Sequence, residues 1–170
     1  MPHNKNKVNW CLKKAEKELK ETNKHRGLIK VKTDQVLIQK HIKKAEHNLN
    51  AVIDFKKIGY SDWSASAAFY SIYHCMLAII NKFGYESRNQ ECSFALIYQF
   101  IEDNKISLNK DLIEQVKLIN NEEIQESPTI INIRESEQYG VSLSLKSQTF
   151  DKLLNISQII LNQTKILVET

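Results

Sequence analysis

The stretch WSASAAFYSIYHCMLAIINKF, residues Trp63 to Phe83, decides the fold of this chain. Apolar side chains cover almost the whole circumference of a helix drawn through it, and Gly84 follows as a terminator. Because a helix that is apolar all round must be covered on every side, we expect it at the centre of a helical bundle. Ser61 or Asp62 is expected to cap its start. Small residues would let neighbouring helices approach closely; they are Ala65, Ser66, Ala67, Ala68, Ser71 and Ala78.

The same stretch is not expected to cross a membrane. Its apolar part, roughly Ala65 to Phe83, is interrupted by five polar residues, Ser66, Ser71, His74, Asn81 and Lys82. We therefore predict a buried core helix, too polar and too short to span a bilayer. The N-terminus is polar and basic and lacks the apolar region of a signal peptide, so a cytoplasmic location is expected.

Further helices are predicted on both sides of the central one. The first opens at Thr33 or Asp34, either of which can cap it, and ends near Gly59. Its apolar seam recurs at steps of four and three residues and consists of Ile38, Ile42, Ala45, Leu49 and Val52. The later helices are marked by Phe94, Ile97, Tyr98 and Ile101; by Leu112, Val116 and Ile119, from about Asn109 to Glu123; and by Leu153, Ile156, Ile160 and Leu167, from about Thr149 to Val168.

Residues 127–146 carry two conflicting signals. Ser127-Pro128 is a good cap and first turn for a helix that reaches Tyr139 and ends at Gly140. However, Val141, Leu143 and Leu145 alternate with serines, as in a strand. We favour the helix up to Tyr139 followed by extended chain over 141–147, and a small hairpin is the alternative.

The composition supports an all-α fold. Four glycines and two prolines in 170 residues are too few for the many turns of a β-sandwich or barrel. We predict an up-and-down bundle of four to five core helices over residues 33–170. A short basic helix from Asn9 or Trp10 to about Thr22, with a linker, occupies residues 1–32 and is expected to dock weakly because its apolar stripe is narrow.

Charge is distributed unevenly between these two parts. Residues 1–32 hold ten Lys and Arg against three Glu, and residues 33–170 hold fourteen against seventeen acidic residues, so charges of +7 and −3 sum to +4. A basic arm on a mildly acidic body is typical of contact with phosphate or with an acidic protein face. A solvated charged helix is the alternative. The lysines expected on the phosphate-facing surface are Lys13, Lys14, Lys17 and Lys20.

The cysteines and histidines do not indicate a metal site. Cys11, Cys75 and Cys92 are odd in number and lack paired spacing, so we interpret them as reduced thiols. His41 and His47, six residues apart, do not share a helix face well enough to chelate an ion. No metal and no cofactor is therefore expected.

Few residues are candidates for chemistry. The chain contains none of the common phosphate-binding loops and no esterase motif, so an enzyme is not indicated. His74 follows Tyr70 by four residues on the central helix; it is either a core residue bonded to a neighbour or a functional one. In INIRESEQYG, Arg134 and Tyr139 could flank one groove, where a guanidinium binds phosphate and a phenol bonds or stacks on a base. The alternative is a surface arginine beside a tyrosine that closes the bundle.

Several short motifs, in this order and spacing, resemble a HEPN domain of the prokaryotic branch. The first helix carries Lys44-Ala45 with Leu49, and the central helix carries Ala68-Phe69-Tyr70 with Tyr73-His74. WCLKKAEKE (Trp10–Glu18) and RESEQYG (Arg134–Gly140) are also similar to members of that branch. The resemblance extends over roughly residues 10–168 and rests on short, degenerate motifs.

The resemblance implies a four- or five-helix bundle that often dimerises and is often paired with a minimal nucleotidyltransferase as toxin and antitoxin. Active relatives cleave RNA without metal, through an arginine that steadies the phosphate and a histidine four to six residues later that acts as base. Here Arg134 matches the arginine and Tyr139 stands in place of the histidine. Because a phenol of pKa near 10 is a poor base at neutral pH, catalysis is in doubt.

The sequence therefore predicts a bundle that binds a partner, a nucleotidyltransferase, and RNA or nucleotide, as a homodimer. Arg134, Tyr139 and His74 are expected to form its groove. Two alternatives stay open: a metal-independent RNase toxin that uses Arg134, with Tyr139 as a substitute or orienting residue, and a dimerising scaffold without a ligand.

Overall fold

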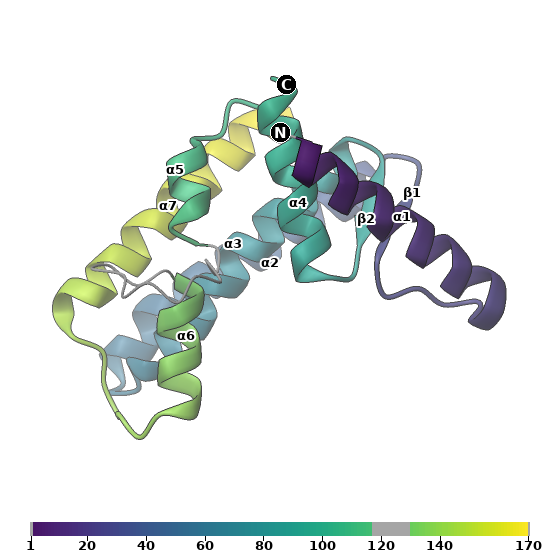
Figure 1. Ribbon diagram of the computed structural model, residues 1–170. Helices are drawn as coiled ribbons and strands as arrows, with labels where there is room; N and C mark the ends of the chain where they lie inside the picture. Colours follow the sequence, from purple (N-terminus) through teal and green to yellow (C-terminus); the bar gives the residue numbers. More distant parts are fainter. Residues whose placement is uncertain (1, 117–129, 170) are drawn as a thin grey trace.

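The computed structural model describes residues 2–116 and 130–169 and confirms the all-α class (Figure 1). The helices found within these residues are α1 (Pro2–Thr22), α2 (Gln35–Lys57), α3 (Asp62–Lys82), α4 (Gln90–Glu102), α5 (Lys110–Glu114), α6 (Ile130–Tyr139) and α7 (Ser147–Glu169). Two three-residue strands, β1 (Leu28–Lys30) and β2 (Tyr85–Ser87), pair antiparallel. This small sheet was not predicted.

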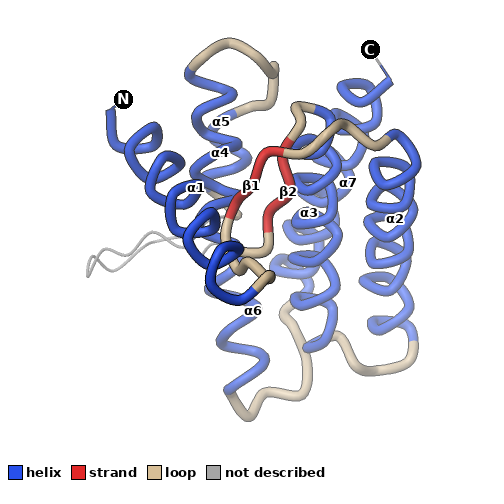
Figure 2. Tube along the Cα trace, turned by 90° about the vertical axis from the view of Figure 1, so that its right-hand side faces the viewer, coloured by secondary structure: helices blue, strands red, loops and turns tan. Residues whose placement is uncertain are grey.

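Helix α3 lies at the centre, as the apolar sequence predicts. It contacts α2, α7, α6, α4 and β2, and α2, α3 and α7 run side by side (Figure 2). Its small polar residues are satisfied by the neighbouring helix: Ser64 Oγ donates to the carbonyl of Val52, and Ser71 Oγ donates to that of Ala45, both at 2.8 Å. These short bonds require the two helices to pack closely.

The expectation that this helix is too short and too polar to cross a membrane is wrong on length and composition. Asp62–Lys82 meets both requirements for a span, but 67% of its most apolar window is buried inside the protein. The other helices supply the apolar environment that a bilayer would otherwise provide.

The ends of α2 follow the predicted signals. Asp34 caps its start, because the carboxylate accepts hydrogen bonds from the backbone N–H groups of Val36 and Leu37. Gly59 follows its end with φ of +88°, a left-handed conformation that suits glycine. At the next helix, Ser61 precedes α3 but forms no side-chain cap; its Oγ accepts from the N–H of Leu145 instead.

The second half of the chain agrees with the sequence where it is described. Helices α4 and α7 include the predicted spans, and α6 ends at Tyr139 as expected. Residues 140–146 contain no strand, so the hairpin alternative is wrong there. The helix expected over 109–123 is described only as far as α5 and residue 116; Ile119 and the Ser127-Pro128 cap lie outside the described residues.

The N-terminal helix differs from the expectation in length and in docking. It spans 21 residues and packs on α4 and β1, on the side of the molecule away from α6 (Figure 1). Val8, Cys11 and Ala15 are buried along its inner face. Small residues at Cys11 and Ala15 allow the close approach of Gly27, where an added Cβ would lie 3.1 Å from the Cys11 carbonyl oxygen. The narrow apolar stripe is therefore buried against α4 and β1.

The interpretation of all three cysteines as reduced thiols is wrong for two of them. Cys11 of α1 and Cys92 of α4 form a disulfide, and Cys75 is the buried free thiol. A separation of 81 residues carries no local signal of pairing. The two sulfurs meet because α1 packs against α4.

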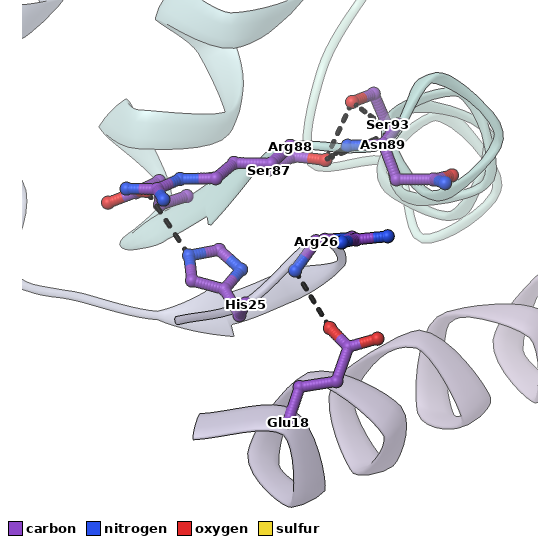
Figure 3. A network of polar contacts seen from close by, with 8 residues as sticks. Glu18, His25, Arg26, Ser87, Arg88, Asn89 and Ser93 are labelled. Carbon is purple, nitrogen blue, oxygen red and sulfur yellow. Dashed lines mark hydrogen bonds and ion pairs between the residues drawn. The ribbon is translucent and has the colours of Figure 1, made fainter. Parts of the chain in front are cut away.

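Polar contacts join α1, the strands and α4 (Figure 3). Glu18 accepts from the backbone N–H of Arg26 at 2.8 Å, and the buried His25 pairs with Glu86 at 3.2 Å. On the other side, Ser93 Oγ donates to Ser87 Oγ at 2.8 Å. These contacts hold the residue 23–32 linker against the body.

Candidate functional site

Arg134 projects from α6 onto the central helix. Its guanidinium carbon lies 4.3 Å from the centre of the Phe69 ring, a cation–π contact, and its side chain is only 12% exposed. Nη2 lies 3.4 Å from Glu135 Oε1, and Nε is buried without a hydrogen-bond partner among the described residues. The guanidinium is therefore held by the aromatic face, with donor capacity left over.

Glu137, three residues after Arg134 on α6, is a perturbed carboxylate. Burial raises the pKa of Glu137, and the charge of Asp62 at the start of α3 raises it further. Glu137 Oε2 is buried and has no partner among residues 2–116 and 130–169. A carboxyl group in this environment holds its proton more readily than an exposed one.

Tyr139 does not share a face with Arg134. Five residues correspond to about 140° around an α-helix, so the two side chains point in different directions. Accordingly, the Tyr139 side chain is 81% exposed whereas Arg134 is covered by Phe69. The structure does not bring these two residues into one groove.

His74 has a partner that the sequence did not indicate. Its Nδ1 lies 3.0 Å from Nδ1 of His41 on α2, with the rings tilted by 34°. Burial lowers the pKa of His74 to about 4, helped by the charges of His41 and Lys44, and burial also lowers the pKa of His41. Both rings are therefore neutral at pH 7, and one donates its proton to the other. The two positions lie 33 residues apart on different helices, so no helical spacing relates them.

A cavity of about 310 Å³ opens beside His41. It lies between α2, the end of α3 and β2, and Glu86 and Arg88 bring opposite charges to its wall. Its lining residues are Leu37, His41, Leu77, Asn81, Tyr85, Glu86, Ser87 and Arg88. His74, Arg134 and Tyr139 are not among them.

The histidine pair predicts a loss of stability in mild acid. The folded pKa of both rings lies below the unfolded value of about 6.5, so the unfolded chain binds more protons as the pH falls. We expect the free energy of unfolding to be fully present above pH 6.5 and to decrease between pH 6.5 and 4. Urea unfolding at pH 7.0 and 5.0 measures this difference.

His74→Gln should make that decrease smaller, because it removes the more strongly shifted group. His47→Gln provides the control, since His47 is exposed on the same helix as His41. A pH dependence that is unchanged in the His74 variant would contradict the assignment.

The four lysines of α1 lie on its exposed face but are partly neutralised. Lys17 pairs with Glu21 at 3.7 Å, and Lys20 pairs with Glu16 at 2.8 Å. Lys14 lies 5.0 Å from the centre of the Trp10 ring, and Lys13 is exposed beside it. Of the predicted phosphate-facing surface, Lys13 and Lys14 thus retain most of the charge for a ligand.

One exposed apolar surface was not predicted as a site. Six large side chains, each 55–97% exposed, gather where the α2–α3 turn meets the α6–α7 loop. The Ser61–Leu145 hydrogen bond joins the two segments, which lie at the same end of the bundle (Figure 2). We call this surface the apolar end; its residues are Ile58, Tyr60, Trp63, Tyr139, Val141 and Leu143.

The sequence contained a signal for this surface, but it was interpreted differently. The alternation of Val141 and Leu143 with serines resembles a strand, and in the structure both side chains point to solvent, 97% and 81% exposed. Turn residues at Ile58 and Tyr60 gave no such signal.

No family model matches the chain, and no curated protein matches it significantly.

Proposed function

We propose that this chain is a HEPN-type helical bundle that binds a partner protein, a minimal nucleotidyltransferase, as one half of a toxin–antitoxin-type pair. The observation that carries the proposal is the apolar end. Large apolar side chains left exposed at one end of a fold are typical of a protein–protein interface, and aromatic side chains such as Tyr60, Trp63 and Tyr139 are the usual anchors.

The packing of α6 on α3 supports the HEPN part of the proposal. The two stretches that carry the resemblance, Ala68–His74 and Arg134–Gly140, are distant in sequence, but they meet where Arg134 stacks on Phe69. The arginine of the family's motif is thus positioned by the aromatic residue of the central-helix motif. Tyr139 then projects from the same helix into the apolar end.

Binding is favoured over catalysis by the same geometry. An arginine that steadies a phosphate must present its guanidinium to the ligand, whereas that of Arg134 is covered by Phe69. Tyr139 points away from Arg134 and is 81% exposed. The RNase alternative would need α6 to rotate or a second chain to complete the site.

Disruption of the apolar end is expected to weaken the complex. Co-expression with the product of a neighbouring nucleotidyltransferase gene should give a co-purifying complex. The double variant Val141→Ser/Leu143→Ser removes the two most exposed apolar side chains of the α6–α7 loop and should weaken the affinity at least about tenfold, or about 1.4 kcal/mol. Titration calorimetry on the purified chains measures the difference.

Val36→Ser is the matched control, because Val36 is 64% exposed at the opposite end of α2 and should leave the affinity unchanged. Equal affinities for the two variants would refute a role for the apolar end. Light scattering of the chain alone tests whether a second copy of the chain occupies this surface instead. A dimer that the double variant dissociates would assign the surface to that second copy. Growth arrest that Arg134→Ala abolishes would favour the RNase.

A further inference from the structure

We propose that His41 and His74 form a binding site for a divalent transition-metal ion, with Zn²⁺ as the test ion. The two Nδ1 atoms face one another at 3.0 Å across the interface of α2 and α3. Imidazole nitrogens bound to such an ion lie about 2.0–2.1 Å from it, so two of them are about 2.8–3.4 Å apart for bond angles between 90° and the tetrahedral value. The pair is thus spaced for one ion, and both rings must turn so that their lone pairs converge on it.

The packing around the pair favours pre-organisation. Ser71 bonds the carbonyl of Ala45, which fixes α2 against α3 within one turn of both histidines. Each ring comes from a different helix, so neither the 41–47 nor the 70–74 spacing along one helix reveals the pair. Both imidazoles are partly exposed, which gives an ion access from solvent.

The chemistry of the pair is suited to ligation. Neutral imidazole is the form that binds metals, and histidine is the commonest metal ligand among side chains. In the hydrogen-bonded pair, one of the two Nδ1 atoms carries a proton, and that Nδ1 must lose it before it can bind an ion. The ring does so by carrying its proton on Nε2 instead, so binding requires a change of tautomer and no net release of protons.

Neighbouring charges make the site one of moderate affinity. Glu86 acts favourably on a cation near His41, whereas Lys44 acts unfavourably near His74. Arg88, on the wall of the adjoining cavity, is paired with Glu86 at 2.8 Å. No cluster of three or more His, Cys, Asp or Glu ligands occurs among the described residues, so water completes the coordination.

Titration of the untagged chain with Zn²⁺ by isothermal calorimetry at pH 7.5 tests the proposal. We expect one saturable site whose affinity falls at least tenfold in His74→Ala and in His41→Ala. His47→Ala, which removes an exposed histidine from the same helix as His41, should retain it. Absence of saturable binding, or equal affinity in wild type and His74→Ala, would overturn the site.

A second readout covers a variant that folds poorly. His74→Gln retains a hydrogen-bonding group toward His41 but removes a ligand, and circular dichroism checks its helix content. Zn²⁺ should raise the melting temperature of the wild type and of His47→Ala but not that of His74→Gln. A rise of equal size in all three proteins would place the ion elsewhere.

Discussion

Loss of the disulfide between Cys11 and Cys92 is expected to lower the free energy of unfolding by about 3–5 kcal/mol. The bond closes a loop across 81 positions of sequence, so its absence gives the unfolded chain much more conformational freedom. It also joins α1 to α4, and α1 contributes few large apolar side chains of its own. Without the bond, we expect α1 to be the first element to detach.

Urea unfolding of the oxidised wild type, the wild type in dithiothreitol, and Cys11→Ala measures this effect. The reduced protein and the variant should lose similar amounts of stability, and dithiothreitol should not destabilise the variant further. Cys75→Ala is the matched control. It also removes a fully buried sulfur, but from a free thiol, so the variant should remain sensitive to dithiothreitol.

Mass spectrometry under non-reducing conditions decides whether the bond forms. Three titratable thiols in the purified protein, or a stability that dithiothreitol leaves unchanged, would contradict the expectation. The result also bears on location, since lasting disulfides belong to oxidising compartments. The cytoplasmic location stays a prediction, and the cysteines no longer support it.

Phe69→Ala is expected to lower the free energy of unfolding by about 3–5 kcal/mol. Phe69 is fully buried at the centre of α3, stacks on Tyr73 at 5.9 Å and meets Tyr70 edge-on at 5.3 Å. The substitution therefore leaves a cavity in the core. It also removes the ring beneath Arg134, whose side chain is only 12% exposed and whose one polar contact among the described residues is with Glu135.

Trp63→Ala supplies the comparison on the same helix. Trp63 is 55% exposed, so its loss should cost about 1 kcal/mol or less. Chemical denaturation of both variants at pH 7 gives the two values. Similar losses would mean that Phe69 is not the centre of the core, and the packing of α6 through Arg134 would lose its basis.

Amide hydrogen exchange shows which helices of the Phe69→Ala variant lose stability. Amides of α6 should lose protection before those of α2, because α6 contacts the rest of the described protein mainly through α3, whereas α2 packs on both α3 and α7. Uniform loss of protection across α2 and α6 would instead indicate a single cooperative unit.

The sequence by itself determined the class of fold and most helix boundaries. The run from Trp63 to Phe83 could only be a covered central helix, because every face of it is apolar. Asp34 and Gly59 set the ends of α2 through local bonds and a left-handed backbone, and such signals act within one turn of the chain. It also predicted that α6 ends at Tyr139, whereas a hairpin after it stayed an open alternative until the structure showed no strand over 140–146.

Only the tertiary structure decided which residues meet. His41 with His74, Cys11 with Cys92, and Arg134 with Phe69 are pairs from different helices, separated by 33 to 81 positions. It also turned Arg134 inward and Tyr139 outward, and it gathered the apolar end from two distant turns. The physical reason is range: periodicity and capping depend on neighbours along the chain, whereas these contacts depend on how whole helices pack.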